Sequence, residues 1–330
     1  MKIKRILILL ICLAFAFGGA SCKKATPDVV FIYKGSLKDG YMNQYTHEGL
    51  KSSCELYGLK LEEIQLTEES GSELDVTEVL AKTPGLAVFA GEGLENICLS
   101  SAKNFPAVNF ALVGGDADGN LDGVQDAQNI YSIVFRREQA GFLSGLYAAC
   151  KSVDSVGFVG KYEYLSYIEY EAGFTAGIKS VNKDLEIVKF YRGDETDDAV
   201  SFDALASAIA NCDIIYTIDE ADYIYNVAGQ LNIPVIGAVY NYRTQGMDFI
   251  VKEDILSAVN AMMEVYYNGL MKGQIARFGL GEGALSESYA AEDQSVADVI
   301  NLWKNLVVGG IVKVPTTRTG AAQYVSPIIQ

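Results

Sequence analysis

The sequence predicts an α/β protein built on parallel sheets, and two observations carry the prediction. Unbroken apolar runs of strand length recur along the chain, as expected for strands that are buried on both faces. Segments with apolar residues at helical spacing separate these runs, and such alternation is typical of parallel α/β architectures. Because the strand–helix series restarts near Ser155 in a chain of 330 residues, we expect two lobes rather than one sheet.

The apolar runs predict strands over residues 28–33, 85–90, 107–113, 155–159, 185–191, 213–218 and 233–237. Helical spacing predicts helices over residues 45–57, 136–151, 167–181, 199–210, 221–231 and 254–270. The first of these helices should end at Gly58, because glycine is the favoured residue just past a helix. Residues 311–315 begin like a strand, but Pro315 cannot donate to a sheet and the residues after it are mostly polar, so we expect that segment to run along an edge or as a loop.

The amino-terminal segment is predicted to direct export. Residues 1–5 are rich in basic side chains. An apolar run over residues 6–17 follows them, and Gly-Gly-Ala-Ser then precedes Cys22. The run is shorter than the ~20 apolar residues of a membrane span. The approach to Cys22 resembles a bacterial lipobox. We therefore expect a signal peptide over 1–21, a lipid on Cys22, a tether over 22–27 and an extracytoplasmic protein anchored to the cell membrane. A plain secreted protein is the alternative.

The net charge and the cysteine positions limit which partners and which cross-links we expect. The formal net charge is −16 and becomes more negative once the basic residues of the first five positions are removed, which argues against nucleic acid or anionic lipid head groups as partners of the globular part. The cysteines that remain after Cys22 form no C-x-x-C pair; they are Cys54, Cys98, Cys150 and Cys212. We expect them to be core thiols without a disulfide framework.

The chain lacks the patterns of an enzyme, a metal site or a cofactor site. His47 is the only histidine, and no nucleophile elbow, phosphate loop or dinucleotide fingerprint follows a predicted strand. Residues 116–123 space oxygen donors like a calcium loop, but Leu121 and Ala127 replace the glycine and the glutamate that such a loop requires. We therefore predict no catalytic residues, no metal and no cofactor.

Tyrosines gather at the ends of the predicted strands. The chain has 20 Tyr and one Trp, and a group of these tyrosines lies at or just past strand ends: Tyr33, Tyr41, Tyr162, Tyr164, Tyr191 and Tyr240. Ligands of open α/β sheets bind outside the carboxyl ends of the strands, so a tyrosine-lined cleft is expected there. The alternative is that these rings cap the core.

Several segments resemble one protein family in their order and spacing. They are residues 41–51, 134–145, 156–160, 171–182 and 249–252, and they are similar to the basic membrane protein family, the purine nucleoside receptor A type of ABC transporter solute-binding lipoprotein. The resemblance implies a type I periplasmic-binding-protein fold with two Rossmann-like lobes joined by a three-segment hinge. It implies lobe I over 28–132 plus 241–276 and lobe II over 133–240 plus 277–330, with a nucleoside-like ligand passed to an ABC permease.

The resemblance also implies a ligand site, from which this sequence departs. Met42 stands where the family has a stacking Phe, and Tyr33, Gly114 and Val239 fall at or near positions of family aspartates. The expected ligand-binding residues are Tyr41, Met42, Asn43, Glu92, Gly93, Asp116, Tyr164, Asp219, Tyr240 and Lys252. Aromatic rings would stack on the ligand and the polar groups would hydrogen-bond to it.

Two readings of function follow. The first is a lipid-anchored solute-binding protein that captures a small polar ligand between its lobes and performs no chemistry on it. The second is a surface lipoprotein that keeps the fold but acts as an adhesin or a signalling partner without high-affinity capture, which the departures in the ligand site motivate.

Overall fold

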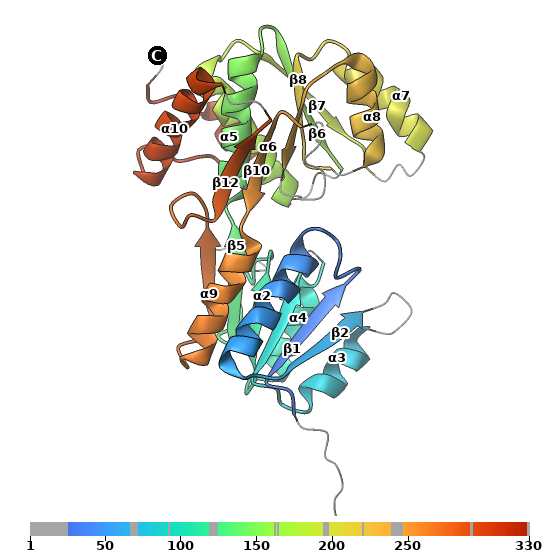
Figure 1. The fold of residues 1–330 in the computed structure, drawn as a ribbon, viewed down its shortest axis with the longest axis vertical. Helices are drawn as coiled ribbons and strands as arrows, with labels where there is room; N and C mark the ends of the chain where they lie inside the picture. The colour runs from blue at the N-terminus through green and yellow to red at the C-terminus, as the bar shows by residue number, and fades with distance from the viewer. Residues whose placement is uncertain are drawn as a thin grey trace, which may run out of the picture.

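The protein consists of two sheets, each covered by helices on both faces (Figure 1). The structure is a computed structural model. It describes residues 26–66, 72–91, 93–118, 125–161, 163, 165–193, 198–219, 221–238, 247–290 and 293–328. The predicted signal peptide and Cys22 therefore lie outside the described residues, as do Glu92, Tyr162, Tyr164 and Tyr240. Within the described ranges, no helix is long and apolar enough to cross a membrane.

The first sheet is wholly parallel, in the order β11-β5-β4-β3-β1-β2. Its strands are β1 (Val29–Lys34), β2 (Leu61–Leu66), β3 (Leu86–Ala90), β4 (Asn109–Val113), β5 (Ile130–Phe135) and β11 (Gln274–Phe278). Helices α2 (Met42–Tyr57), α3 (Ser72–Leu80), α4 (Glu95–Asn104) and α9 (Ile255–Tyr267) accompany it. Successive residues of β1 serve opposite faces: Phe31 packs in the cluster with α2 and α9, and Ile32 in the cluster with α3 and α4.

The second sheet has the order β12-β10-β9-β8-β6-β7 and is parallel except for β12. Its strands are β6 (Ser155–Gly160), β7 (Glu186–Tyr191), β8 (Ile214–Thr217), β9 (Val235–Ala238), β10 (Phe249–Glu253) and β12 (Leu285–Tyr289). Its helices are α5 (Arg137–Lys151), α6 (Leu165–Val181), α7 (Asp198–Ile209), α8 (Asp222–Leu231), α10 (Gln294–Val308) and α11 (Arg318–Gln323). One core cluster joins this sheet to α5, α6 and α10, and another joins it to α7 and α8.

The chain crosses between the sheets three times. The crossings follow β5, β10 and β11, each of which leads from one sheet to an element of the other. The predicted partition is wrong for β10, because residues 241–276 were assigned to lobe I and Phe249–Glu253 pairs with β9 and β12 of the second sheet. Phe249 and Val251 belong to the second sheet's core, which is the physical reason for this placement. The ends of β5 and β11 lie in the first sheet, a few residues beyond the predicted boundaries at 132 and 276.

Helices α5 and α6 pack backbone to backbone through glycines. A Cβ atom added at Gly141 would meet the carbonyl oxygen of Tyr170, and one at Gly173 would meet the carbonyl oxygen of Glu138. Only glycine permits so close an approach of two helix backbones. Both glycines lie in the segments that carry the family resemblance, so these segments build the scaffold of the second lobe.

Glu171, in the same segments, bonds to Arg318 and so links α6 to the carboxyl-terminal helix α11. Its side chain is almost fully buried and accepts hydrogen bonds from Lys189 Nζ at 2.5 Å, from Arg318 Nη2 at 2.8 Å and from the Tyr191 hydroxyl. Burial alone would raise the pKa of Glu171, but these donors lower it below its ordinary value. Arg318 begins α11, so this cluster holds α11 against α6. As expected from Pro315, residues 311–317 form no strand.

Candidate functional site

The carboxyl edges of the two sheets meet at Glu253, the last residue of β10. Tyr41, which follows β1, donates a hydrogen bond from its hydroxyl to Glu253 Oε2 at 2.8 Å. Tyr170 of α6 donates to Glu253 Oε1 at 2.7 Å. Glu253 is only 6% exposed. Because β10 is parallel to β9, this contact places the carboxyl ends of the second sheet opposite those of the first.

The structure fixes the ionisation of the tyrosine on the second-sheet side. Burial first, and then the nearby carboxylate of Glu253, raise the pKa of Tyr170 well above its ordinary value. Its hydroxyl therefore remains protonated and remains a donor at neutral pH. Charge-assisted hydrogen bonds of this kind are stronger than neutral ones, so Glu253 acts as a clasp between the two sheets.

A second set of polar contacts lies beside this clasp, where β4 and β5 end. Arg137 Nη2, at the start of α5, donates to the Gly114 carbonyl oxygen at 2.9 Å. Arg277 of β11 pairs with Asp116 at 3.2 Å. Burial raises the pKa of the Asp116 carboxyl and outweighs the opposing effect of Arg277.

Glu169 of α6 joins the same region. Burial raises the pKa of Glu169 to about 7, with Arg137 acting in the opposite direction and Glu138 in the same one. A carboxyl group that titrates near neutral pH thus lies beside the first crossing between the sheets.

Among the predicted ligand residues, Asn43 and Met42 are engaged within the protein. The Asn43 amide nitrogen donates to the carbonyl oxygens of Lys34, at 2.8 Å, and Ser36, at 3.3 Å, and so closes the loop between β1 and α2. Met42 is 6% exposed and fills the space in front of Gly114, where a Cβ atom would meet its methyl group. The structure thus gives both side chains a packing or loop-closing role.

The other described candidates are spread along both edges. Gly93 adopts a left-handed φ of +86° and donates its N–H to Glu95. Asp219, after β8, accepts from the Ala221 N–H at 3.1 Å, and its Oδ2 lies 3.8 Å from Arg192 Nε. Lys252 is partly buried on β10, opposite Ser286 of β12.

The structure brings some of these residues together and keeps others apart. Tyr41, Met42 and Asp116 lie near Gly114, at the end of the first sheet, whereas Asp219 belongs to the second sheet and interacts with Arg192. The Arg192 guanidinium in turn lies over the Tyr223 ring, 5.6 Å from its centroid.

Sequence reasoning missed Glu253, Tyr170, Arg137 and Arg192. A signal for Glu253 existed, because it is an acidic residue placed directly after a buried strand, at the edge where ligands bind. Arg192 likewise follows β7 directly.

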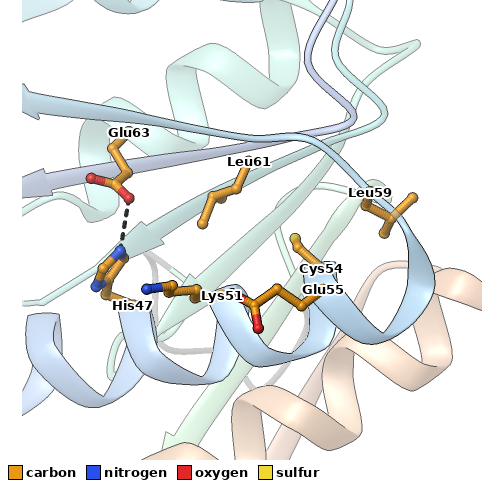
Figure 2. Close-up of a pocket in the computed structure, with 7 residues that line it drawn as sticks. All are labelled: His47, Lys51, Cys54, Glu55, Leu59, Leu61 and Glu63. Carbon is orange, nitrogen blue, oxygen red and sulfur yellow. Dashed lines mark hydrogen bonds and ion pairs between the residues drawn. The ribbon is translucent and has the colours of Figure 1, made fainter.

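A separate hollow lies between α2 and the edge strand β2, on the outside of the first sheet (Figure 2). It encloses about 290 Å³ and is lined by His47, Lys51, Cys54, Glu55, Leu59, Leu61 and Glu63. His47 Nε2 lies 2.7 Å from a Glu63 carboxylate oxygen across its mouth. Burial raises the pKa of the Cys54 thiol to about 11, so this cysteine is not a thiolate at neutral pH.

The arrangement of two facing sheets with three crossings defines the class of protein. An ABC transporter solute-binding protein from Conexibacter woesei has the same fold, with a TM-score of 0.69 and 20% sequence identity over 87% of this chain and 98% of that one. The fold is therefore the type I periplasmic-binding-protein fold. At this level of identity, the likeness describes the fold alone.

Sequence comparison identifies the family. The family described as ABC transporter substrate-binding protein PnrA-like matches residues 26–317, and this chain belongs to it. Basic membrane protein B of Borreliella afzelii is 25% identical, over 98% of this chain and 97% of its own length. A protein of Lactococcus lactis named ABC transporter nucleoside-binding protein BmpA is 27% identical, over 58% of this chain and 52% of its own length.

Proposed function

We propose that this substrate-binding protein of the ABC transporter family captures a nucleoside or nucleoside-like solute between the carboxyl edges of its two sheets. The solute is then handed to an ABC permease, and no chemistry is performed on it. The observation that carries the proposal is the meeting of both carboxyl edges at Glu253, since such edges are where α/β sheets bind ligands.

Contacts at this edge support a polar, ring-containing ligand. Tyr41 offers an aromatic ring, while Asp219 and Arg192 offer an acceptor and a donor from the opposite sheet. The Lactococcus lactis relative is named a nucleoside-binding protein, which favours a nucleoside. The exported, lipid-anchored state completes the proposal and rests on the apolar segment 6–17 followed by Cys22.

Thermal unfolding of refolded protein tests the proposal. The chain would be unfolded and refolded to remove any carried-over solute and then heated with nucleosides, nucleobases, sugars and amino acids in turn. A ligand at a hundred times its dissociation constant adds ~2.7 kcal/mol of stability, so a nucleoside should raise the melting temperature clearly. A rise with sugars or amino acids alone would contradict the nucleoside assignment.

An adhesin or signalling role without high-affinity capture is the second candidate. The internal use of Asn43 and Met42 favours it, because two side chains expected to touch a ligand already have other partners. Under this alternative, no member of the panel changes the melting temperature.

A further inference from the structure

An exposed apolar patch lies at the amino end of the first sheet, where α2 and α9 finish. Leu56 is 75% exposed, Tyr267 54% and Leu270 68%. The Tyr57 ring stacks on the Tyr267 ring with centroids 4.1 Å apart and planes inclined by 13°. We call these four residues the base face. Three of them are more than half exposed and Tyr57 is partly exposed, whereas exposed apolar side chains of a soluble protein are normally scattered singly.

The two helices hold the base face together. Ser52 Oγ of α2 donates to Asn260 Oδ1 of α9 at 3.4 Å, so this side of α2 is turned towards α9. Leu56 follows Ser52 by about one helical turn and lies on the same side. Figure 1 shows α2 and α9 side by side, both ending at the same end of the first sheet.

The chain enters β1 beside the ends of α2 and α9, the two helices that carry most of the base face. The Asp28 N–H donates to the Lys60 carbonyl oxygen at 3.1 Å, just after α2. The Tyr266 hydroxyl, in the last turn of α9, lies 3.5 Å from the Asp28 carbonyl oxygen. Asp28 is therefore enclosed by the ends of the two helices that carry the base face.

The predicted lipid anchor is close to this point. Cys22 precedes Asp28 by six residues, and extended chain spans at most ~3.6 Å per residue, so the two are within about 20 Å of each other. A lipid on Cys22 would thus hold Asp28 within about 20 Å of a bilayer, beside the helix ends that carry the base face. The strands of the first sheet run away from this end, so the carboxyl edges lie on the far side.

Charges around the base face permit contact with a lipid surface. Lysines occur in the connections that lead into the strands, at Lys60, Lys82 and Lys272, although the whole chain has a net charge of −16. The carboxylate of Asp28 is bonded to the Lys60 amide at 2.8 Å, and Glu62 lies 3.8 Å from Lys82. Glu55 and Glu264 lie one turn further into α2 and α9, and the exposed Glu78 lies in the last turn of α3.

We propose that the base face rests in the interfacial layer of the phospholipid bilayer that carries the lipid anchor. This inference depends on the lipid anchor of the proposed function. Tyrosine suits the layer because its ring is apolar and its hydroxyl is hydrated, and the leucines reach past it into the acyl region. The contact can be weak, because the tether keeps the local lipid concentration high.

A second copy of this chain fits the base face less well. Stable interfaces bury about 800 Å² on each partner, contributed by about 20 residues or more, whereas the base face has four. Contact with the bilayer would also orient the molecule, with the first sheet near the membrane and the carboxyl edges away from it.

Fluorescence quenching tests the inference in the full, lipidated chain. The Tyr267→Trp variant would be placed in phosphatidylethanolamine–phosphatidylglycerol vesicles whose acyl chains are brominated near the headgroups. We expect quenching of about twofold or more, because bromine quenches tryptophan only at short range. Val153→Trp is the matched control, since Val153 is 79% exposed but lies in the second lobe, after α5. The natural Trp303 is buried there and serves as an internal reference.

The outcomes separate this inference from the anchor on which it depends. Vesicle flotation reports the anchor, and protein that does not float would remove both the anchor and the inference. Protein that floats but shows equal quenching at positions 267 and 153 would overturn the base face alone. Adding Leu56→Glu and Leu270→Glu to the Tyr267→Trp variant should abolish its quenching while flotation persists. Persistent quenching in that variant would contradict insertion of these leucines.

Discussion

The clasp at Glu253 makes a testable prediction about how the two sheets are joined. Replacing Tyr41 with Phe removes one hydroxyl and keeps the ring. The lost hydrogen bond, 2.8 Å long and directed to a carboxylate that is 6% exposed, should lower the free energy of unfolding. Hydrogen bonds to charged groups contribute about 1.5–3 kcal/mol, so a loss of that size is expected.

A double-mutant cycle isolates this contact from other effects of the substitution. The free energy of unfolding would be measured by urea denaturation for the native protein, Tyr41→Phe, Glu253→Gln and the double variant. If the hydroxyl and the carboxylate interact as the structure shows, the two changes should be coupled by ~1 kcal/mol or more. Tyr170→Phe with Glu253→Gln is the parallel cycle within the second lobe. Additive effects, within about 0.5 kcal/mol, would refute the clasp.

The same position separates a ligand role from a structural one. If the Tyr41 ring stacks on the solute, Tyr41→Ala should weaken binding by about 1–3 kcal/mol while Tyr41→Phe leaves affinity nearly unchanged. If Tyr41 only joins the two sheets through Glu253, both variants should lose stability but bind the solute with equal affinity.

Three further predictions concern the scaffold and its pH dependence. The raised pKa of Glu169 means that the native state disfavours its ionised form. Ionised Glu169 therefore lowers the free energy of unfolding fully above pH 7, and this destabilisation is absent below pH 4.5. Glu169→Gln should therefore stabilise the protein at pH 8, by up to about 3 kcal/mol, and not at pH 4, as urea denaturation would show; an equal effect at both would contradict this. Gly173→Ala should cost about 2 kcal/mol or more in thermal unfolding, because its Cβ meets backbone, whereas Gly229→Ala, with open space, should be tolerated; equal costs would refute the close packing. Asn43→Ala should lower stability by about 1–3 kcal/mol through the loss of two loop hydrogen bonds, and an unchanged urea midpoint would contradict that role.

Much of the fold could be predicted because its central strands are buried on both faces. β1, β3 and β6 read as uninterrupted apolar runs, which is what such burial requires. Five of the described strands were not predicted. β2, β11 and β12 lie at sheet edges and carry polar or charged residues between their apolar ones, whereas β5 and β10 are central and largely buried. The edge strand β7 was predicted, from the run over residues 185–191. Four of the described helices, α3, α4, α10 and α11, were not predicted either, although α10 carries an apolar stripe.

The candidate site was predictable only in position. In a parallel sheet, residues that follow the strands gather at one edge. This rule placed Tyr41, Asp116 and Asp219 at carboxyl edges, where the structure has them. Their partners could not be predicted, because Tyr41 and Glu253 are 212 residues apart and meet only once both sheets have formed. The internal use of Asn43 also depends on the conformation of the loop after β1, which residue types alone do not specify.

A crystal structure with bound solute would show where on the two sheets the ligand binds. The chain would be crystallised with whichever nucleoside raises its melting temperature. We expect the solute to lie between the carboxyl edges, with Tyr41 on one side and the Asp219–Arg192 pair on the other. A solute seated elsewhere, such as in the hollow beside His47, would contradict it.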